Sequence, residues 1–153
     1  MTQFSHLPVS TDWRYISVKK LFLFLISILL ILIAGFRPVG FDRDSIAYIL
    51  LLDTPLNQAD LKDKEPAFWL IVELNRSLFE GNERTFFLIF AILGVSLKII
   101  AISRLSLDPI LSLWIYICSY FLLHDMTQIR AGVASGIFLL SIQDMHNKNF
   151  KSF

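Results

Sequence analysis

The stretch from Leu21 to Phe36 reads LFLFLISILLILIAGF and contains no charged residue, and Lys19 and Lys20 immediately precede it. An α-helix rises about 1.5 Å per residue, so a helix over this stretch nearly crosses a hydrocarbon core of about 30 Å. The stretch is long for a signal-peptide core and ends without an A-x-A cleavage site, which favours an uncleaved anchor. We therefore predict a first membrane span over residues 16–36.

The composition agrees with a membrane protein. Of 153 residues, 55% are hydrophobic and 18% are charged, which is more apolar than an ordinary soluble domain. The formal net charge of +1 excludes the basic surplus typical of a protein that binds nucleic acid. Cys118 is the single cysteine and cannot form an intramolecular disulfide.

Three more apolar segments follow, over residues 86–104, 108–124 and 125–142. The first contains Lys98, which we expect to snorkel toward the nearer membrane surface. The second opens with Asp108 and Pro109, a good helix start. The fold predicted is all-α, a polytopic transmembrane helix bundle of about four spans.

Charge asymmetry predicts the orientation of these spans. Basic residues collect on one side of the layout, and that side is cytoplasmic by the positive-inside rule. They are Arg14, Lys19, Lys20, Lys98, Arg104, Lys148 and Lys151. The predicted loop over residues 37–85 is acidic and lies on the opposite side. Both tails, residues 1–15 and 143–153, are then cytoplasmic.

The outer loop contains two predicted helices joined by a polar connection over residues 57–64. The first covers Ile46 to Leu52 and is apolar nearly all round, so we expect it to be buried. The second runs from Glu65-Pro66 to Glu80-Gly81 and is amphipathic, as is typical of a helix that lies in a membrane interface or against other spans.

Arg130 is the strongest candidate for a functional charge at membrane depth. Its planar guanidinium suits phosphate oxygens, although it would equally pair with Asp125 or anchor a helix end. The same segment contains Gly132-x-x-x-Gly136, a spacing that permits close helix packing.

Several acidic residues and one histidine have more than one interpretation. Asp42 and Asp44 flank Arg43 just after the first span and are candidates for a general base, a divalent-cation site or helix caps. Glu65 is either a base or a cap. His124, next to Asp125, is either a proton carrier or an interface residue.

Four short motifs together resemble a known family. They are Arg37-x-x-Gly40-x-Asp42, Tyr48, Glu65-Pro66-x-Phe68 and Gln128-Ile129-Arg130-x-x-Val133-Ala134. The chain resembles, from about Leu21 to Ile142, the EpsG family of bacterial exopolysaccharide and capsule proteins, which are Wzy-like repeat-unit polymerases of the inner membrane. Members often have Gln where this chain has Ala131, and they are usually much longer. The resemblance therefore implies an N-terminal portion of a longer bundle and leaves open whether the chain acts alone.

The resemblance also implies a reaction, the transfer of a growing glycan from undecaprenyl diphosphate to a hydroxyl of another lipid-linked repeat unit, in exopolysaccharide, capsule or O-antigen biosynthesis. The roles that it implies are Arg130 and Arg37 on the diphosphate, Asp42 or Glu65 as the base, and Asp44, His124 and Gln128 as further substrate-binding residues. No nucleotide sugar is required, because the lipid diphosphate already activates the donor. No cofactor is expected and no metal-binding residue is assigned, while metal dependence stays open. The expected partners are this lipid-linked oligosaccharide, membrane lipid and other polysaccharide assembly subunits, with no nucleic acid.

Two other functional classes remain open. One is a non-catalytic scaffold or accessory of polysaccharide export. The other is a polyprenyl-phosphate-dependent glycosyltransferase that adds a single sugar. Product analysis separates these classes, because a polymerase alone makes a ladder of repeats.

Overall fold

The computed structural model describes residues 13–54 and 65–148, and these residues are helical with short connections and no strand. The predicted polar connection over 57–64 and most of the predicted N-terminal tail lie outside the described residues. The elements in chain order are α1 (Trp13–Gly35), α2 (Arg43–Asp53), α3 (Pro66–Phe79), α4 (Glu83–Leu105), α5 (Pro109–Ile115), η2 (Tyr116–Asp125) and α6 (Ile129–Lys148). The all-helical prediction is confirmed for this part of the chain.

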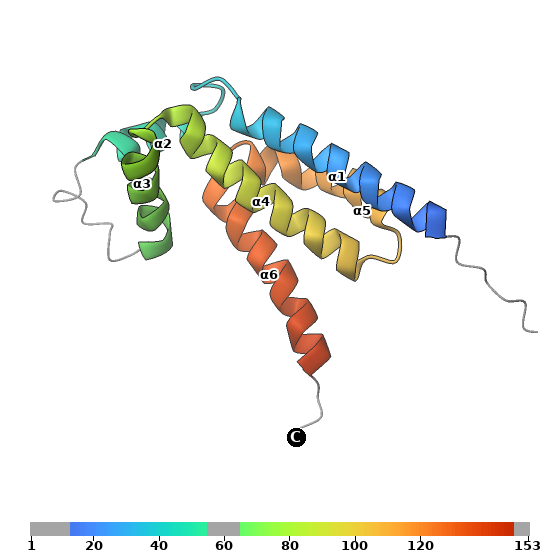
Figure 1. Ribbon diagram of the computed structural model, residues 1–153. Helices are drawn as coiled ribbons and strands as arrows, with labels where there is room; N and C mark the ends of the chain where they lie inside the picture. The colour runs from blue at the N-terminus through green and yellow to red at the C-terminus, as the bar shows by residue number, and fades with distance from the viewer. Residues whose placement is uncertain (1–12, 55–64, 149–153) are drawn as a thin grey trace, which may run out of the picture.

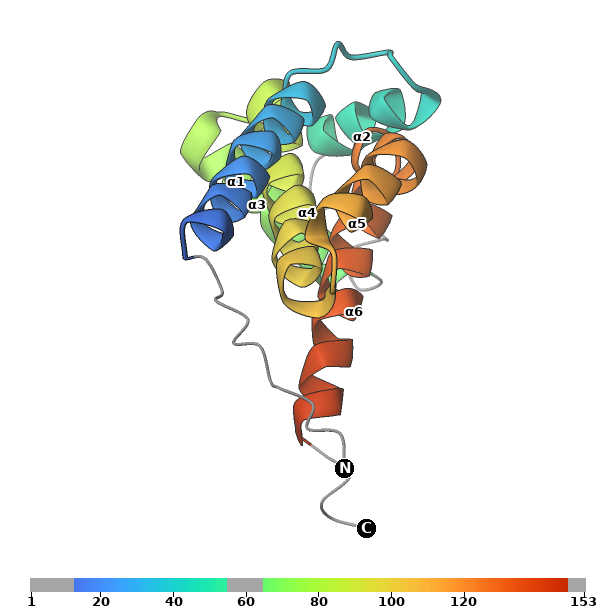
Figure 2. The same ribbon diagram turned by 90° about the vertical axis from the view of Figure 1, so that its right-hand side faces the viewer.

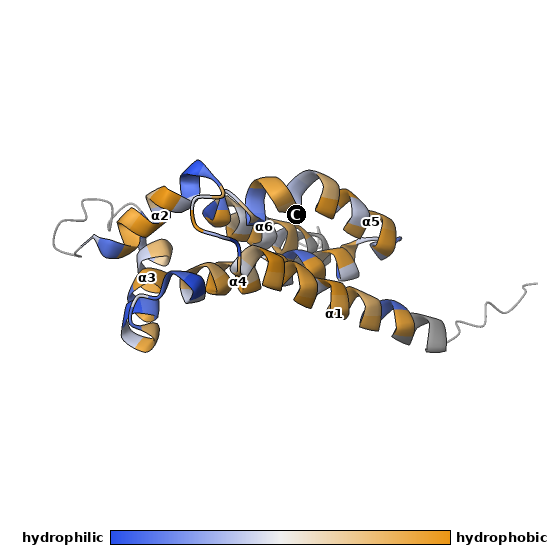
Figure 3. Ribbon diagram, turned by 90° about the horizontal axis from the view of Figure 1, so that it is seen from above, coloured by the Kyte–Doolittle hydropathy of each residue, from blue (hydrophilic) through white to orange (hydrophobic). Residues whose placement is uncertain are grey.

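Within the described residues, two helices are long and apolar enough to cross a membrane. They are α1, over Val18–Gly35, and α4, over Glu83–Leu105. The apolar segments Pro109–Asp125 and Ile129–Ile142 are helical but shorter. Large apolar side chains are exposed along α1, and hydrophobic residues cover most of its described length (Figure 3). Such a surface suits a lipid environment, and the arrangement of four spans stays a prediction.

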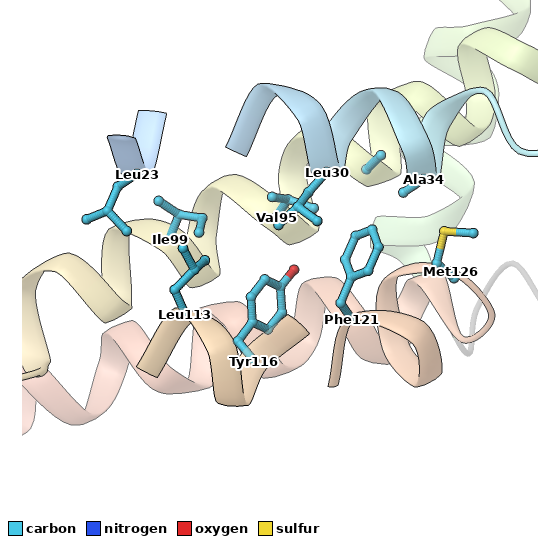
Figure 4. Packing of buried hydrophobic residues seen from close by; sticks show 10 residues of the cluster. Leu23, Leu30, Ala34, Val95, Ile99, Leu113, Tyr116, Phe121 and Met126 are labelled. Atoms are coloured by element: carbon cyan, nitrogen blue, oxygen red, sulfur yellow. The ribbon is translucent and has the colours of Figure 1, made fainter. Parts of the chain in front are cut away.

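Helix α4 lies at the centre of the molecule, packed against α1 on one side and α6 on another (Figure 1). Side chains from α1, α4, α5 and η2 form one buried apolar cluster that includes Leu30, Val95, Leu113 and Phe121 (Figure 4). Close packing of α6 depends on small residues, as the sequence predicted. A Cβ at Gly136 would lie 2.7 Å from the Cβ of Leu97, so a larger side chain there would push α6 off α4.

A second cluster holds α2 and α3 against the N-terminal half of α4. Phe68 of α3 lies at its centre, with its ring centroid 6.3 Å from that of Tyr48 and 6.0 Å from those of Phe86 and Phe90. Aromatic pairs at such distances contribute about 0.5–1.5 kcal/mol each beyond their burial. The amphipathic helix predicted to begin near Glu65 is thus present as α3, with Phe68, Trp69 and Val72 buried in this cluster, whereas Leu78 and Phe79 at its end are exposed.

The burial predicted for α2 is wrong. Only one face of this helix is covered, with Ser45, Tyr48 and Leu52 buried, whereas Ile46 and Leu50 are more than half exposed. The physical reason is its place at the end of the bundle (Figure 2), where no described element covers its outer face. Apolar composition alone did not distinguish burial in protein from exposure to lipid.

Arg76 of α3 ties the two short helices together. Its guanidinium donates hydrogen bonds to the carbonyl oxygens of Leu52 and Thr54, at the C-terminal end of α2. The carbonyl groups at a helix end have no partner within the helix, so Arg76 supplies donors for them. This contact fixes the last turn of α3 against the C-terminal end of α2.

Candidate functional site

A pocket of about 480 Å³ lies between α2, the start of α3 and the start of α6. Its polar lining consists of Asp44, Tyr48, Glu65, Gln128 and Arg130. Four of these five were candidate site residues from the sequence, and Tyr48 belonged to the motif set. The fold thus brings three separate segments of the sequence to one place.

Glu65 and Arg130 form an ion pair across this pocket, although 65 residues separate them in the chain. Arg130 donates from Nη1 to Oε2 of Glu65, and the two side chains are 42% and 44% exposed. Glu65 occupies the N-cap position of α3 but its side chain makes no capping hydrogen bond. The sequence suggested Asp125 as a partner of Arg130, but the structure pairs Arg130 with Glu65, and the Glu65 side chain does not cap α3.

Aromatic rings hold Arg130 in position. Its guanidinium carbon lies 5.4 Å from the ring centroid of Tyr48 and 5.2 Å from that of Phe68. A cation over an aromatic face is attracted by the ring quadrupole, and arginine is the cation most often found there.

The chemistry available in the pocket follows from these groups. A guanidinium offers five N–H donors in a plane that matches phosphate oxygens. The carboxylate of Glu65 is a proton acceptor at the same place, and the amide of Gln128 offers both a donor and an acceptor. An anionic substrate with a hydroxyl group is the class of molecule that uses all of them.

Arg37 lies outside this pocket, in the connection between α1 and α2. It is buried, its guanidinium carbon is 4.4 Å from the ring centroid of Phe87, and its Nη1 donates to the carbonyl oxygen of Asp125 at 3.3 Å. Its Nε and Nη2 are buried without a partner among the described residues. Arg37 lines a separate cavity of about 550 Å³ together with Arg84.

Burial lowers the pKa of the Arg37 guanidinium from its ordinary value, and the carboxylate of Asp42 opposes part of this fall. Asp42 stands at the N-cap position of α2, yet its side chain does not cap the helix. Both of its carboxylate oxygens are buried without a partner in the described part of the chain. Arg37 and Asp42 thus form a second charged group beside the pocket rather than within it.

His124 also lies outside the lining of the pocket. Its ring stacks on that of Tyr120, with centroids 5.5 Å apart, and its Nδ1 is buried with no partner within residues 13–54 and 65–148. In the same residues, no three His, Cys, Asp or Glu side chains gather closely enough to hold a metal ion.

The sequence analysis missed a buried charged cluster around Asp125, the residue whose carbonyl oxygen accepts the hydrogen bond from Arg37. Lys98 of α4 donates to both carboxylate oxygens of Asp125 at 2.8 Å, and Tyr116 donates to Oδ2 of Asp125 at 2.7 Å. Lys98 and Asp125 are 2% and 3% exposed. The predicted snorkelling of Lys98 toward a membrane surface is therefore wrong, because Asp125 neutralises the lysine inside the bundle.

The π-helix η2 explains how Tyr116 and Asp125 meet. Nine residues of an α-helix make about two and a half turns and would place these side chains on opposite faces. The hydrogen bonds of a π-helix run from residue i to i+5, as from the N–H of Met126 to the carbonyl oxygen of Phe121 at 3.0 Å, which gives more residues per turn. Both side chains then face α4. The sequence did offer a signal for the Lys98–Asp125 pair. It has a single lysine in an apolar span and an aspartate at membrane depth, and such charges need a partner.

Comparisons with curated proteins and with solved structures gave no match. A comparison with protein-family models gave a match over residues 20–153, which includes all four motifs and every residue of the pocket. The model matched is that of the EpsG family, and the chain therefore belongs to the EpsG family.

Proposed function

We propose that this protein takes part in polymerising lipid-linked oligosaccharide repeat units at the outer face of the bacterial inner membrane. Membership of the EpsG family supports a polymerase-like membrane protein of polysaccharide biosynthesis. The apolar helices α1 and α4 agree with a membrane location. The specific reaction proposed is glycosyl transfer from undecaprenyl diphosphate to a hydroxyl group of a second lipid-linked unit.

One observation carries the proposal. The segment that begins with Glu65-Pro66 and the segment that contains Arg130 are the most distinctive motifs of the sequence, and their charged residues meet in an ion pair that lines a pocket. An ion pair whose side chains are 42% and 44% exposed contributes little to the stability of a helix bundle. The meeting of a phosphate-binding cation and a proton acceptor is what glycosyl transfer from a diphosphate requires.

The two charged groups have complementary roles in this proposal. Phosphate oxygens compete with Glu65 for the N–H donors of Arg130, and binding of the diphosphate frees the carboxylate. Glu65 then accepts the proton of the attacking hydroxyl group while the new bond to the anomeric carbon forms. The bond from that carbon to the diphosphate breaks, and undecaprenyl diphosphate leaves with the electron pair and the negative charge that Arg130 stabilises.

The remaining candidates take supporting roles. Glu65 fits the base better than Asp42 because it shares the pocket with Arg130, whereas Asp42 lies beside Arg37. The unpartnered Nε and Nη2 of Arg37 support a second contact to phosphate oxygens. Asp44 and Gln128 line the pocket and are suited to sugar hydroxyl groups. For His124 the support is weaker, because it lies outside the lining.

The test compares Arg130→Lys and Glu65→Gln in cells that make the polysaccharide. A lysine cannot reproduce the planar, bidentate geometry of the guanidinium, so Arg130→Lys should shorten the polymer ladder sharply and weaken binding of undecaprenyl diphosphate measured by native mass spectrometry. Glu65→Gln should shorten the ladder while binding is retained. Arg43→Lys, an exposed arginine of α2 outside the pocket, is the matched control.

The outcomes separate the functional classes. Ladders of wild-type length from both pocket variants would remove these residues from the mechanism. A product extended by one sugar, rather than by repeats, would indicate a glycosyltransferase that uses a polyprenyl-phosphate donor. If cells that lack this protein still made polymer of normal length, only a non-catalytic role would remain for the protein.

A further inference from the structure

A groove of about 680 Å³ lies between α1 and the C-terminal half of α4. These parts of the two helices lie at the end of the molecule away from α2 and α3 (Figure 1). Its walls are mainly apolar and include Leu23 of α1 and Ile99 of α4. The side chains of these two residues lie near each other between the helices (Figure 4). The groove follows the long axes of the two helices that are apolar enough to cross a membrane.

Small side chains explain why the two helices leave room here. Ser27 of α1 and Ser96 and Ser103 of α4 line the groove where larger residues would fill it. The hydroxyl groups of Ser27 and Ser103 donate to backbone carbonyl oxygens of their own helices, at 2.7 Å and 2.8 Å. These hydroxyl groups are therefore satisfied, and the wall that they present to a guest molecule is nearly apolar.

Positive charge gathers at one end of the groove. Lys20 at the start of α1 and Arg104 at the end of α4 are exposed and line it, and Lys19 lines it as well. The acidic residue nearest in sequence to this end, Asp108, accepts hydrogen bonds from the backbone N–H groups of Ile110 and Leu111 and so serves as the cap of α5. Cations at the end of an apolar groove match the shape and charge of an anionic lipid, which has a phosphate at one end and hydrocarbon behind it.

We propose that this groove binds an anionic glycerophospholipid, with the headgroup phosphate at Lys20 and Arg104 and an acyl chain between α1 and α4. A zwitterionic lipid would gain nothing from the net positive charge, and a soluble anion would gain nothing from the apolar walls. The cations stand where two membrane-crossing helices reach the headgroup level, in the leaflet opposite to the candidate active site. This lipid site is thus separate from the candidate active site, and its test does not depend on the proposed function.

The experiment is native mass spectrometry of the full chain in detergent, titrated with dioleoyl phosphatidylglycerol or dioleoyl phosphatidylcholine. The wild-type chain should retain phosphatidylglycerol in preference to phosphatidylcholine. The double variant Lys20→Gln/Arg104→Gln should lose about tenfold in affinity for phosphatidylglycerol. The matched control Arg43→Gln/Arg84→Gln removes two exposed arginines at the opposite end and should retain the wild-type affinity.

A second pair of variants tests the hydrocarbon part without changing any charge. Ser96→Leu fills the groove and should weaken binding of phosphatidylglycerol, whereas Ser141→Leu, on an exposed part of α6, should not. Equal affinity for the two lipids, or equal loss in the Arg43→Gln/Arg84→Gln control, would overturn the proposal. A lipid-free dimer that Ser96→Leu dissociates would assign the groove to a second copy of the chain and would overturn it as well.

Discussion

Two ion pairs in the part of the chain that the structure describes, Lys98–Asp125 and Glu65–Arg130, differ in almost every physical respect. Lys98 and Asp125 meet inside the bundle, where their side chains are 3% and 1% exposed, and Tyr116 completes the shell of the carboxylate. Glu65 and Arg130 meet at the rim of a pocket, where their side chains are 44% and 42% exposed. Both pairs join segments that are distant in the chain.

This difference separates a structural role from a functional one. A buried charge is costly without its partner, so the Lys98–Asp125 pair has to stay intact for the helices to pack. An exposed pair contributes little to stability because water and salt compete with it. The Glu65–Arg130 pair is therefore free to open for a ligand, and the predictions below test this contrast from the largest expected effect to the smallest.

Breaking the buried pair should have the largest effect on stability. We expect Asp125→Asn to lower the free energy of unfolding by about 3–5 kcal/mol, because the charge of Lys98 then has no counter-charge inside the bundle. Chemical denaturation of the detergent-solubilised chain measures this change. The double variant Lys98→Met/Asp125→Asn should recover part of this loss in free energy. If its loss equalled the sum of the losses of the two single variants, the pairing would be contradicted.

Removing the third member of the buried cluster should cost less. Tyr116→Phe deletes the O–H group that donates to Oδ2 of Asp125 but leaves the lysine in place. A hydrogen bond to a charged group contributes about 1.5–3 kcal/mol, and we expect a loss of that size in the same assay. Tyr120→Phe, at an exposed tyrosine that stacks on His124, is the control and should be nearly neutral.

A methyl group placed beside the buried carboxylate should disturb it without removing any charge. A Cβ at Gly94 would lie 2.5 Å from Oδ1 of Asp125, so Gly94→Ala forces the carboxylate or α4 to move. Overpacking of this kind costs about 1–3 kcal/mol. Combined with Asp125→Ala, which removes the atom in conflict, Gly94→Ala should cost clearly less. Strict additivity would show that the conflict lies elsewhere.

The exposed pair should give the smallest change in stability. Glu65→Gln is expected to alter the free energy of unfolding by at most about 1 kcal/mol. Raising the salt concentration should weaken the Glu65–Arg130 pair and leave the buried pair almost unchanged, because salt screens exposed charges far more than buried ones. A loss of several kcal/mol in Glu65→Gln would show that the rim pair is structural too.

The sequence predicted the parts of the fold that depend on local patterns. The apolar run from Leu21 to Phe36 and the run that begins at Phe86 are helical, and the helix-start signals at Pro66 and Asp108 are those that the structure uses. The family resemblance, based on four short motifs, is confirmed by the match over residues 20–153.

The parts that could not be predicted depend on contacts between distant residues. Tyr116 and Asp125 face the same side because η2 is a π-helix, and hydropathy gives no sign of that geometry. Arg130 had Asp125 as its nearer carboxylate in the sequence, but Asp125 points toward α4 and leaves Glu65 as the partner. The fold also separates two residues that the sequence analysis assigned to one site, because Arg37 and Arg130 line different cavities.

The most direct test of the account is an exchange of the two exposed charges. The variant Glu65→Arg/Arg130→Glu keeps an ion pair at the rim of the pocket but reverses the positions of the base and the cation. Polymer length in cells that make the polysaccharide is the quantity to measure, with the abundance of the folded chain as the control. We expect normal abundance and no polymer ladder. A ladder of wild-type length would show that the pair serves only to join α3 to α6 and would contradict the account.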